Sequence, residues 1–185
     1  MLALAVNLIA VAAANAQTTS SFSNIKIKNF GQMDERFFRG AQPSEKDYRD
    51  LAALGIKTII DLRDDPTSYE KRDAEAAGMK YVNIPMSDSS RPRDEQIDQF
   101  LKIANDPATG AFYVHCAGGR HRTGVVGAAY RITKYGWDFD KAYAEMKQYD
   151  FYTRFGHGSL KDYVSDYYGH QKSIEVSTGS SSSNK

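Results

Sequence analysis

The sequence contains one cysteine, one tryptophan and five prolines among 185 residues, and its formal net charge is only +1. A single cysteine excludes an intramolecular disulfide framework, so the fold must be stabilised by a hydrophobic core. The near-neutral charge argues against a molecule-wide polyanion-binding surface, and nucleic acid is therefore not an expected partner. The hydrophobic fraction of 41% and the charged fraction of 25% are ordinary for a globular protein. The length suits one domain with a sizeable core.

Positive charge is missing from the start of the chain, where no lysine or arginine precedes Lys26. Residues 2–13 are almost wholly apolar but too short to span a bilayer comfortably, and residues 14–16 have the small-x-small spacing of a signal-peptidase site. We therefore predict a signal peptide at residues 1–16, export to a periplasm or the exterior, and no stable membrane insertion after cleavage. The missing basic start departs from that pattern, and the alternative is a buried N-terminal helix in a cytoplasmic protein.

The other end of the chain has little that a core could bury. It closes on "STGSSSSNK", a composition typical of disorder. We predict a folded domain over residues 21–170 and a disordered tail over residues 171–185, with no internal repeat.

Three short apolar segments, at residues 56–62, 79–84 and 111–116, predict strands. Segments with helical periodicity lie between them, and the first two strands each follow a glycine that ends a helix. This alternation predicts an α/β fold: a single domain with a central, mainly parallel sheet flanked by helices. Ligands bind such sheets at the carboxyl ends of the strands, which is where Cys116 falls.

The segment "VHCAGGRHRTGVV" carries that cysteine into a loop without acidic neighbours. No Asp or Glu lies between Pro107 and Trp137, so the positive potential of the loop is not cancelled by nearby residues. The small residues Ala117, Gly118 and Gly119 allow successive backbone N–H groups to form an anion-binding nest, and the next helix adds the positive end of its dipole. We predict a phosphate-binding loop between a central strand and a helix.

Three side chains of this segment have complementary chemistry. Arg122 can hold two phosphate oxygens with its planar guanidinium. The positive surroundings lower the pKa of Cys116 and favour the thiolate, which is the nucleophilic form. Thr123 could donate its hydroxyl to that thiolate and help it to leave from a phosphocysteine.

Three simpler interpretations compete with this one. A lone cysteine is commonly no more than a small buried hydrophobe. A metal site made of His115, Cys116 and His121 is a poor tetrahedral set, because two of the ligands are adjacent in sequence. A nucleotide-binding loop of Walker type would need the spacing G-x-x-x-x-G-K-[ST], which is absent.

The stretch "HCAGGRHRTG" resembles the signature H-C-x-x-G-x-x-R-[ST]-G of the cysteine-dependent protein tyrosine phosphatase superfamily. Residues 37–63, "FFRGAQPSEKDYRDLAALGIKTIIDLR", are similar to the N-terminal stretch of the atypical dual-specificity phosphatases of plants, fungi and bacteria. The resemblance covers about residues 36–168. It implies a nucleophile at Cys116, release of the thiolate aided by Thr123, a loop oriented by His115, and no metal or cofactor. The phosphate-binding residues that it implies are Ala117, Gly118, Gly119, Arg120, His121 and Arg122.

A phosphatase of this type also needs a carboxylic acid that protonates the leaving group and then activates water. The resemblance places it on a loop after a strand that precedes the cysteine in the chain. The segment "NIPMSDSSRPRDEQ" offers Asp88, just past a strand end, and Asp94, in the first turn of a helix. We predict Asp88, because the helix dipole is already a sufficient reason for a carboxylate at Asp94, which stays the alternative.

The substrate is less constrained. Arg91 and Arg93, with Arg120 and His121, are candidates to hold additional phosphates, although solvated surface arginines are the simpler interpretation. Arg120 stands where the plant and fungal branch often has lysine, and the two differ in hydrogen-bond geometry. We expect hydrolysis of phosphate monoesters on phosphotyrosine, phosphoserine or phosphothreonine proteins, or on phosphoinositides or inositol phosphates. The alternatives are a catalytically inactive phosphate-binding module and a rhodanese-like sulfurtransferase, which needs neither Arg-Thr-Gly nor an acid.

Overall fold

The structure, a computed structural model, describes residues 22–181, so the predicted signal peptide lies outside the described residues. A five-stranded sheet with the order β1-β2-β5-β3-β4 forms its centre. The strands are β1 (Gly31–Gln32), β2 (Phe37–Ala41), β3 (Ile56–Arg63), β4 (Lys80–Met86) and β5 (Ala111–Cys116). Pairings among β2, β5, β3 and β4 are parallel, and β1 pairs antiparallel with β2. The α/β class and the three predicted strands are confirmed.

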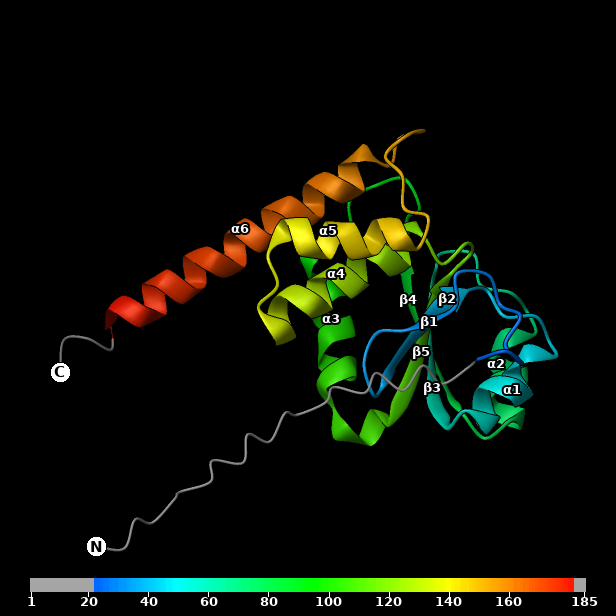
Figure 1. Cartoon of the computed structure of the whole chain (residues 1–185). Coiled ribbons are helices and arrows are strands. Elements are labelled where there is room, and N and C mark those ends of the chain that lie inside the picture. The colour runs from blue at the N-terminus through cyan, green and yellow to red at the C-terminus, as the bar shows by residue number, and fades with distance from the viewer. Residues whose placement is uncertain (1–21, 182–185) are drawn as a thin grey trace, which may run out of the picture.

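Helices cover both faces of the sheet (Figure 1). One face is covered by α1 (Asp47–Ala53) and α2 (Glu70–Ala76). The other is covered by α3 (Asp94–Asn105), α4 (His121–Tyr135), α5 (Phe139–Gln148) and α6 (Gly158–Ser181). A 3-10 turn, η1 (Pro107–Thr109), precedes β5.

Successive residues of the central strands contribute to two separate cores. Ile60 and Phe112 pack on the side of α3 to α6, whereas Ile59 and Tyr113 pack on the side of α1 and α2. Side chains alternate between the two faces of a strand, and both faces of this sheet are buried under helices. The strands therefore appear in the sequence as continuous apolar runs rather than as an alternating pattern.

Strand β2 was not predicted because a charged residue interrupts it. All five of its residues are buried, and Arg39 is only 1% exposed. The guanidinium of Arg39 donates from Nη2 to the carbonyl of Gly119 at 2.7 Å and lies 3.9 Å from the centre of the Tyr149 ring. Burying a cation is costly without such partners. They come from distant parts of the chain, so the local sequence argues against a strand here.

Helix α6 continues to Ser181, into the segment of residues 171–185 for which the sequence predicts disorder, and residues 182–185 lie outside the described residues. An ion pair between Lys172 and Glu175 at 2.7 Å supports this extension, and serine hydroxyls donate to carbonyl oxygens of the preceding turn. A helix already nucleated on the protein body adds one hydrogen bond for each further residue that it orders. Between residues 22 and 181, no helix combines the length and apolar character needed to cross a membrane.

Candidate active site

Cys116 is the last residue of β5, and the loop after it leads into α4. Strand β5 lies between β2 and β3, so the cysteine stands at the carboxyl end of a central parallel strand. The helix begins five residues later, at His121. The predicted loop between a central strand and a helix is thus present.

The conformation of this loop depends on Gly119. Its φ angle is +65°, and a Cβ atom there would lie 2.3 Å from the carbonyl carbon of Gly40 in β2. A side chain is therefore excluded by both backbone strain and lack of space. Residues outside the loop donate hydrogen bonds to its carbonyl oxygens. The main-chain N–H of Gln42 donates to Ala117 at 3.3 Å, the side chain of Asn29 to Gly118 at 2.8 Å, and the side chain of Arg39 to Gly119 at 2.7 Å.

Cys116 lies at the base of the loop and is 3% exposed. Burial raises the pKa of its thiol, but hydrogen bonds from the hydroxyl and the main chain of Thr123, the charge of Arg122 and the main chain of Arg120 lower the pKa below its ordinary value. Among the described residues, the buried Thr123 hydroxyl has no other hydrogen-bond partner. The sulfur is thus the acceptor left to it, and the thiolate is the form that accepts best.

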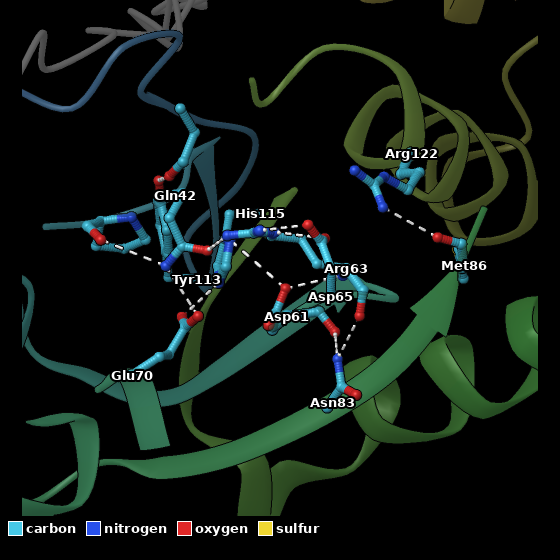
Figure 2. Close-up of polar contacts among 12 residues, drawn as sticks. Gln42, Asp61, Arg63, Asp65, Glu70, Asn83, Met86, Tyr113, His115 and Arg122 are labelled. Carbon is cyan, nitrogen blue, oxygen red and sulfur yellow. Dashed lines mark hydrogen bonds and ion pairs between the residues drawn. The ribbon is translucent and has the colours of Figure 1, made fainter. Parts of the chain in front are cut away.

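Arg122 is also buried, with 5% of its surface exposed. Its Nη1 atom donates to the carboxylate of Asp64 at 2.9 Å. The same atom donates to the carbonyl of Met86 at 3.0 Å (Figure 2). Asp64 lies in the sequence Asp64-Asp65-Pro66, a local pattern typical of a turn that gives no indication of a contact with Arg122. The two contacts fix the orientation of the guanidinium beside the thiol.

A cavity of about 180 Å³ opens over the loop and brings most of the predicted site residues together. Its lining consists of Asp88, Cys116, Ala117, Gly118, Arg120, His121, Arg122, Tyr152 and His157. Gly119 and Thr123 are not part of the lining, because the first packs on β2 and the second is buried at the start of α4.

The two candidate acids are separated by the structure. Asp88 is exposed on the loop between β4 and α3 and contributes to the cavity over Cys116. Asp94 is the first residue of α3, accepts a hydrogen bond from the Tyr163 hydroxyl at 2.9 Å and lines a different cavity, next to α6. Of the two carboxylates, Asp88 is therefore the one placed beside the thiol.

The basic residues expected around the loop divide in the same way. Arg91 pairs with Asp166 at 2.6 Å, Arg93 lies 3.9 Å from Glu95, and neither lines the cavity over the thiol. Arg120 and His121 do line it. Burial lowers the pKa of His121 to about 4, with the neighbouring His157 contributing, so this ring is neutral near pH 7.

Tyr152 and His157 are site residues that the sequence did not reveal. The ring of His157 stacks on that of His121 with 3.6 Å between centroids and 11° between planes, and its Nδ1 atom lies 2.9 Å from the carbonyl oxygen of Asp88. Aromatic residues in a stretch such as residues 149–170 usually belong to a core, which holds for Tyr163 but not for Tyr152. A histidine between two glycines was the only local hint.

A buried polar network lies beneath the loop and centres on His115 (Figure 2). Its Nε2 atom is 2.6 Å from Glu70 of α2, and its Nδ1 atom is 3.8 Å from Asp61 of β3. Gln42 donates to the other carboxylate oxygen of Glu70 at 2.8 Å. Burial lowers the pKa of His115, but the hydrogen bond and charge of Glu70, followed by the charge of Asp61, raise the pKa above its ordinary value overall. The two neighbouring carboxylates therefore favour the protonated imidazole of His115.

The same three side chains are the one group among the described residues with metal-ligand proximity, since their donor atoms lie within 4.8 Å of one another. A protonated imidazole uses both nitrogens as donors and has no lone pair for a metal ion. The cluster thus fits a charged hydrogen-bond network better than a metal centre. Cys116 and His121 do not belong to this group, so the structure does not bring His115, Cys116 and His121 together as a set of metal ligands.

The chain is similar to a phosphatase family and to individual phosphatases. The family model that matches residues 7–161 is described as DSP-PTPase phosphatase fused to NAD+ kinase. A probable tyrosine-protein phosphatase, DG1060 of Dictyostelium discoideum, is 28% identical over 127 residues, covering 65% of this chain and 75% of that protein. Inositol diphosphatase DSP2 of Oryza sativa is 27% identical over 135 residues, covering 65% of this chain and 61% of that protein.

The chain also resembles parts of much longer proteins and has the fold of a solved structure. The chain spans only 10% of the plant NAD kinases that it also matches. The core catalytic domain of the PP-IP phosphatase SIW14 from S. cerevisiae has the same fold, with a TM-score of 0.70 at 19% identity over 84% of this chain and 95% of that one.

Proposed function

The chain belongs to the DSP-PTPase phosphatases, and we propose that it hydrolyses phosphate monoesters through a covalent phosphocysteine at Cys116, without a metal ion. One observation carries the proposal. A buried cysteine with a lowered pKa, the guanidinium of Arg122 and the exposed carboxylate of Asp88 share a single cavity over the loop between β5 and α4. A nucleophile, an oxyanion clamp and a proton donor are the three parts that phosphoryl transfer to sulfur requires.

In the first step, the Cys116 thiolate attacks phosphorus while the bond from phosphorus to the ester oxygen breaks. Arg122 and the loop N–H groups hold the equatorial oxygens of the phosphoryl group. Protonated Asp88 transfers its proton to the departing alkoxide or phenoxide. The products are the free alcohol and a phosphocysteine.

In the second step, the Asp88 carboxylate takes a proton from water, whose oxygen attacks the phosphocysteine. The bond between phosphorus and sulfur breaks, and inorganic phosphate leaves. The buried hydroxyl of Thr123 donates to the thiolate that forms, so the sulfur is stabilised as a leaving group. Asp88 ends the cycle protonated, as it began.

For the substrate, we propose a phosphorylated protein or an inositol phosphate. The named activities of the two relatives, a tyrosine-protein phosphatase and an inositol diphosphatase, support these two classes. Arg120 is the one cation of the cavity lining besides Arg122, and it lies 3.8 Å from Asp150. The rim can therefore offer one further positive group, which suits a substrate with a second anionic group close to the scissile phosphate.

Phosphate release from purified protein in EDTA tests the proposal, with phosphotyrosine and phosphoserine peptides, phosphoinositides and inositol polyphosphates as substrates. We expect turnover that is lost in Cys116→Ser, and the best substrate of the panel identifies the class. Release that survives in Cys116→Ser would overturn the mechanism. Tight substrate binding without release by the native protein would instead indicate a phosphate-binding module.

We also propose that the protein is exported to a periplasm or the exterior. The support is the apolar run at residues 2–13 followed by small residues at positions 14 and 16. N-terminal sequencing of protein recovered from the producing cell tests this. A chain that begins near Gln17 is expected, and an intact chain in the cytoplasm would contradict it.

A further inference from the structure

The loop that carries Asp88 is attached to α6 and to the turn before it, although these segments lie about 70 residues apart in the chain. In Figure 1 the start of α6 lies beside the loop that follows β4. Three contacts make the attachment: His157 Nδ1 to the Asp88 carbonyl at 2.9 Å, Ser159 to the Ser89 carbonyl at 3.1 Å, and Arg91 to Asp166 at 2.6 Å. Tyr163 binds Asp94, the first residue of α3, at 2.9 Å.

Among these contacts, that of His157 is made to Asp88 itself. The Asp88 carbonyl can only accept a hydrogen bond, so Nδ1 of His157 carries a proton and donates it. This bond restrains the main chain of the residue whose side chain must reach the leaving group.

Through its ring, His157 also connects the acid loop to the phosphate-binding loop. Its ring lies flat on His121, the first residue of α4, at 3.6 Å between centroids. His121 in turn lies within hydrogen-bond distance of the Tyr152 carbonyl, at 3.2 Å from Nε2. A continuous path therefore runs from the loop of Cys116 through His121 and His157 to Asp88.

We propose that His157 is a positioning residue that sets Asp88 over Cys116 for proton transfer to the leaving group. The inference rests on the proposed function and adds a residue to it. General acid catalysis needs the proton donor within hydrogen-bond distance of the leaving oxygen, and a displacement of about 1 Å can cost roughly 10²-fold in rate. Asp88 is exposed and its neighbours are serines, so the loop has little packing of its own to hold that distance.

A positioning role differs from a merely structural one in its dependence on the leaving group. Phenyl phosphate needs a proton on its departing oxygen, whereas 2,4-dinitrophenyl phosphate releases an anion stable enough to leave without one. Since kcat/KM reports transfer to the cysteine, a displaced acid lowers kcat/KM for the first compound and spares the second. General loss of structure lowers both.

Two substitutions of His157 separate its hydrogen bond to Asp88 from its stacking on His121. His157→Phe keeps a flat ring for the stack on His121 and removes the donor to Asp88. His157→Asn removes the ring and places an amide nitrogen near the position of Nδ1. His170→Phe, on α6 and outside the cavity over the thiol, is the matched control.

We expect His157→Phe to lower kcat/KM for phenyl phosphate by about tenfold to 10²-fold, and for 2,4-dinitrophenyl phosphate by no more than about threefold. His157→Asn should recover most of the loss, and His170→Phe should match the native protein. In the Asp88→Asn background, His157→Phe should add no further loss, because no acid is left to position.

Equal losses with both substrates, or full activity of His157→Phe on phenyl phosphate, would overturn the role of His157 alone. An Asp88→Asn variant without leaving-group selectivity would also overturn it, since Asp88 would then not be the acid. Failure of the proposed function has a separate signature: no turnover of either compound by the native protein in EDTA, or turnover that survives in Cys116→Ser.

Discussion

The floor and the rim of the pocket are built in different ways. On the floor, Cys116, Arg122 and Thr123 are at most 5% exposed, and one continuous strand, loop and helix position all three. On the rim, Asp88 is exposed and is held through its main chain by His157, 69 residues away. Backbone geometry thus determines the place of the nucleophile, whereas a few side-chain contacts between distant segments determine the place of the acid.

This difference separates the effects expected from substitutions. A change on the floor alters attack on phosphorus and should slow every substrate alike. A change on the rim alters protonation and should slow only those substrates whose leaving group needs a proton.

The largest effect is expected for Arg122→Lys on the floor. Lysine loses the planar fork and the contacts with Asp64 and Met86, so kcat/KM should fall by about 10²- to 10³-fold for good and poor leaving groups alike. Steady-state kinetics on phenyl and 2,4-dinitrophenyl phosphate measure this. Arg49→Lys, an exposed residue of α1 outside the pocket, is the control and should stay near native activity. A selective loss with phenyl phosphate alone would remove the distinction between floor and rim.

A large but selective effect is expected for Asp88→Asn on the rim. Loss of the acid should lower kcat/KM for phenyl phosphate by roughly 10²-fold or more and leave 2,4-dinitrophenyl phosphate little changed. The same two substrates measure it, with Asp94→Asn as control, because Asp94 bonds Tyr163 and lines another cavity. If Asp94→Asn shows the selective loss instead, the alternative acid is the correct one.

Thr123→Val is expected to slow the alkylation of Cys116 by about tenfold near neutral pH. Without the hydroxyl donor the pKa of Cys116 should rise, so alkylation by iodoacetamide should need higher pH, whereas Thr123→Ser should stay near native. The folded protein lowers the pKa of Cys116, so the thiolate contributes stability that is fully present above the ordinary thiol pKa and is lost as pH falls through the folded pKa. The pH-dependent stability deficit of Thr123→Val should thus be largest at alkaline pH. An unchanged alkylation profile would show that Thr123 does not stabilise the thiolate.

The smallest effect is expected from removal of residues 171–185. The contacts of α6 with the acid loop come from Ser159 and Asp166, and Tyr163 binds the start of α3; the truncated chain keeps all three residues. Activity on both substrates should stay within about twofold of native, since none of the described residues among those removed lines the cavity over Cys116. A leaving-group-selective loss would mean that the end of α6 helps to hold the rim.

Sequence reasoning could predict the floor because its chemistry is contiguous. The spacing of Cys116, Gly119 and Arg122, on a loop after an apolar run, carries the nucleophile, the left-handed turn and the clamp in one short segment. The sheet was predictable for the same reason where its strands are wholly apolar. Asp88 was the predicted acid, and the structure places it beside the thiol.

What the sequence could not predict depends on partners supplied by tertiary structure. Arg39 is tolerated in a buried strand because the carbonyl of Gly119 and the ring of Tyr149 contact its guanidinium. Asp64, which follows β3, binds Arg122 of α4. His157 had no visible partner until the fold brought it to Asp88. The polar end of α6 looked disordered because its stability comes from the packed turns before it and not from its own composition.

The central claim is that phosphate passes through a covalent bond to Cys116. Rapid quenching of turnover in acid, followed by mass spectrometry of the peptide around the loop, tests it most directly, and Asp88→Asn helps because water activation is slowed. We expect one phosphoryl group on Cys116 that appears with substrate and disappears as turnover ends. Full turnover with the thiol never modified, or with the phosphoryl group on another residue, would contradict it.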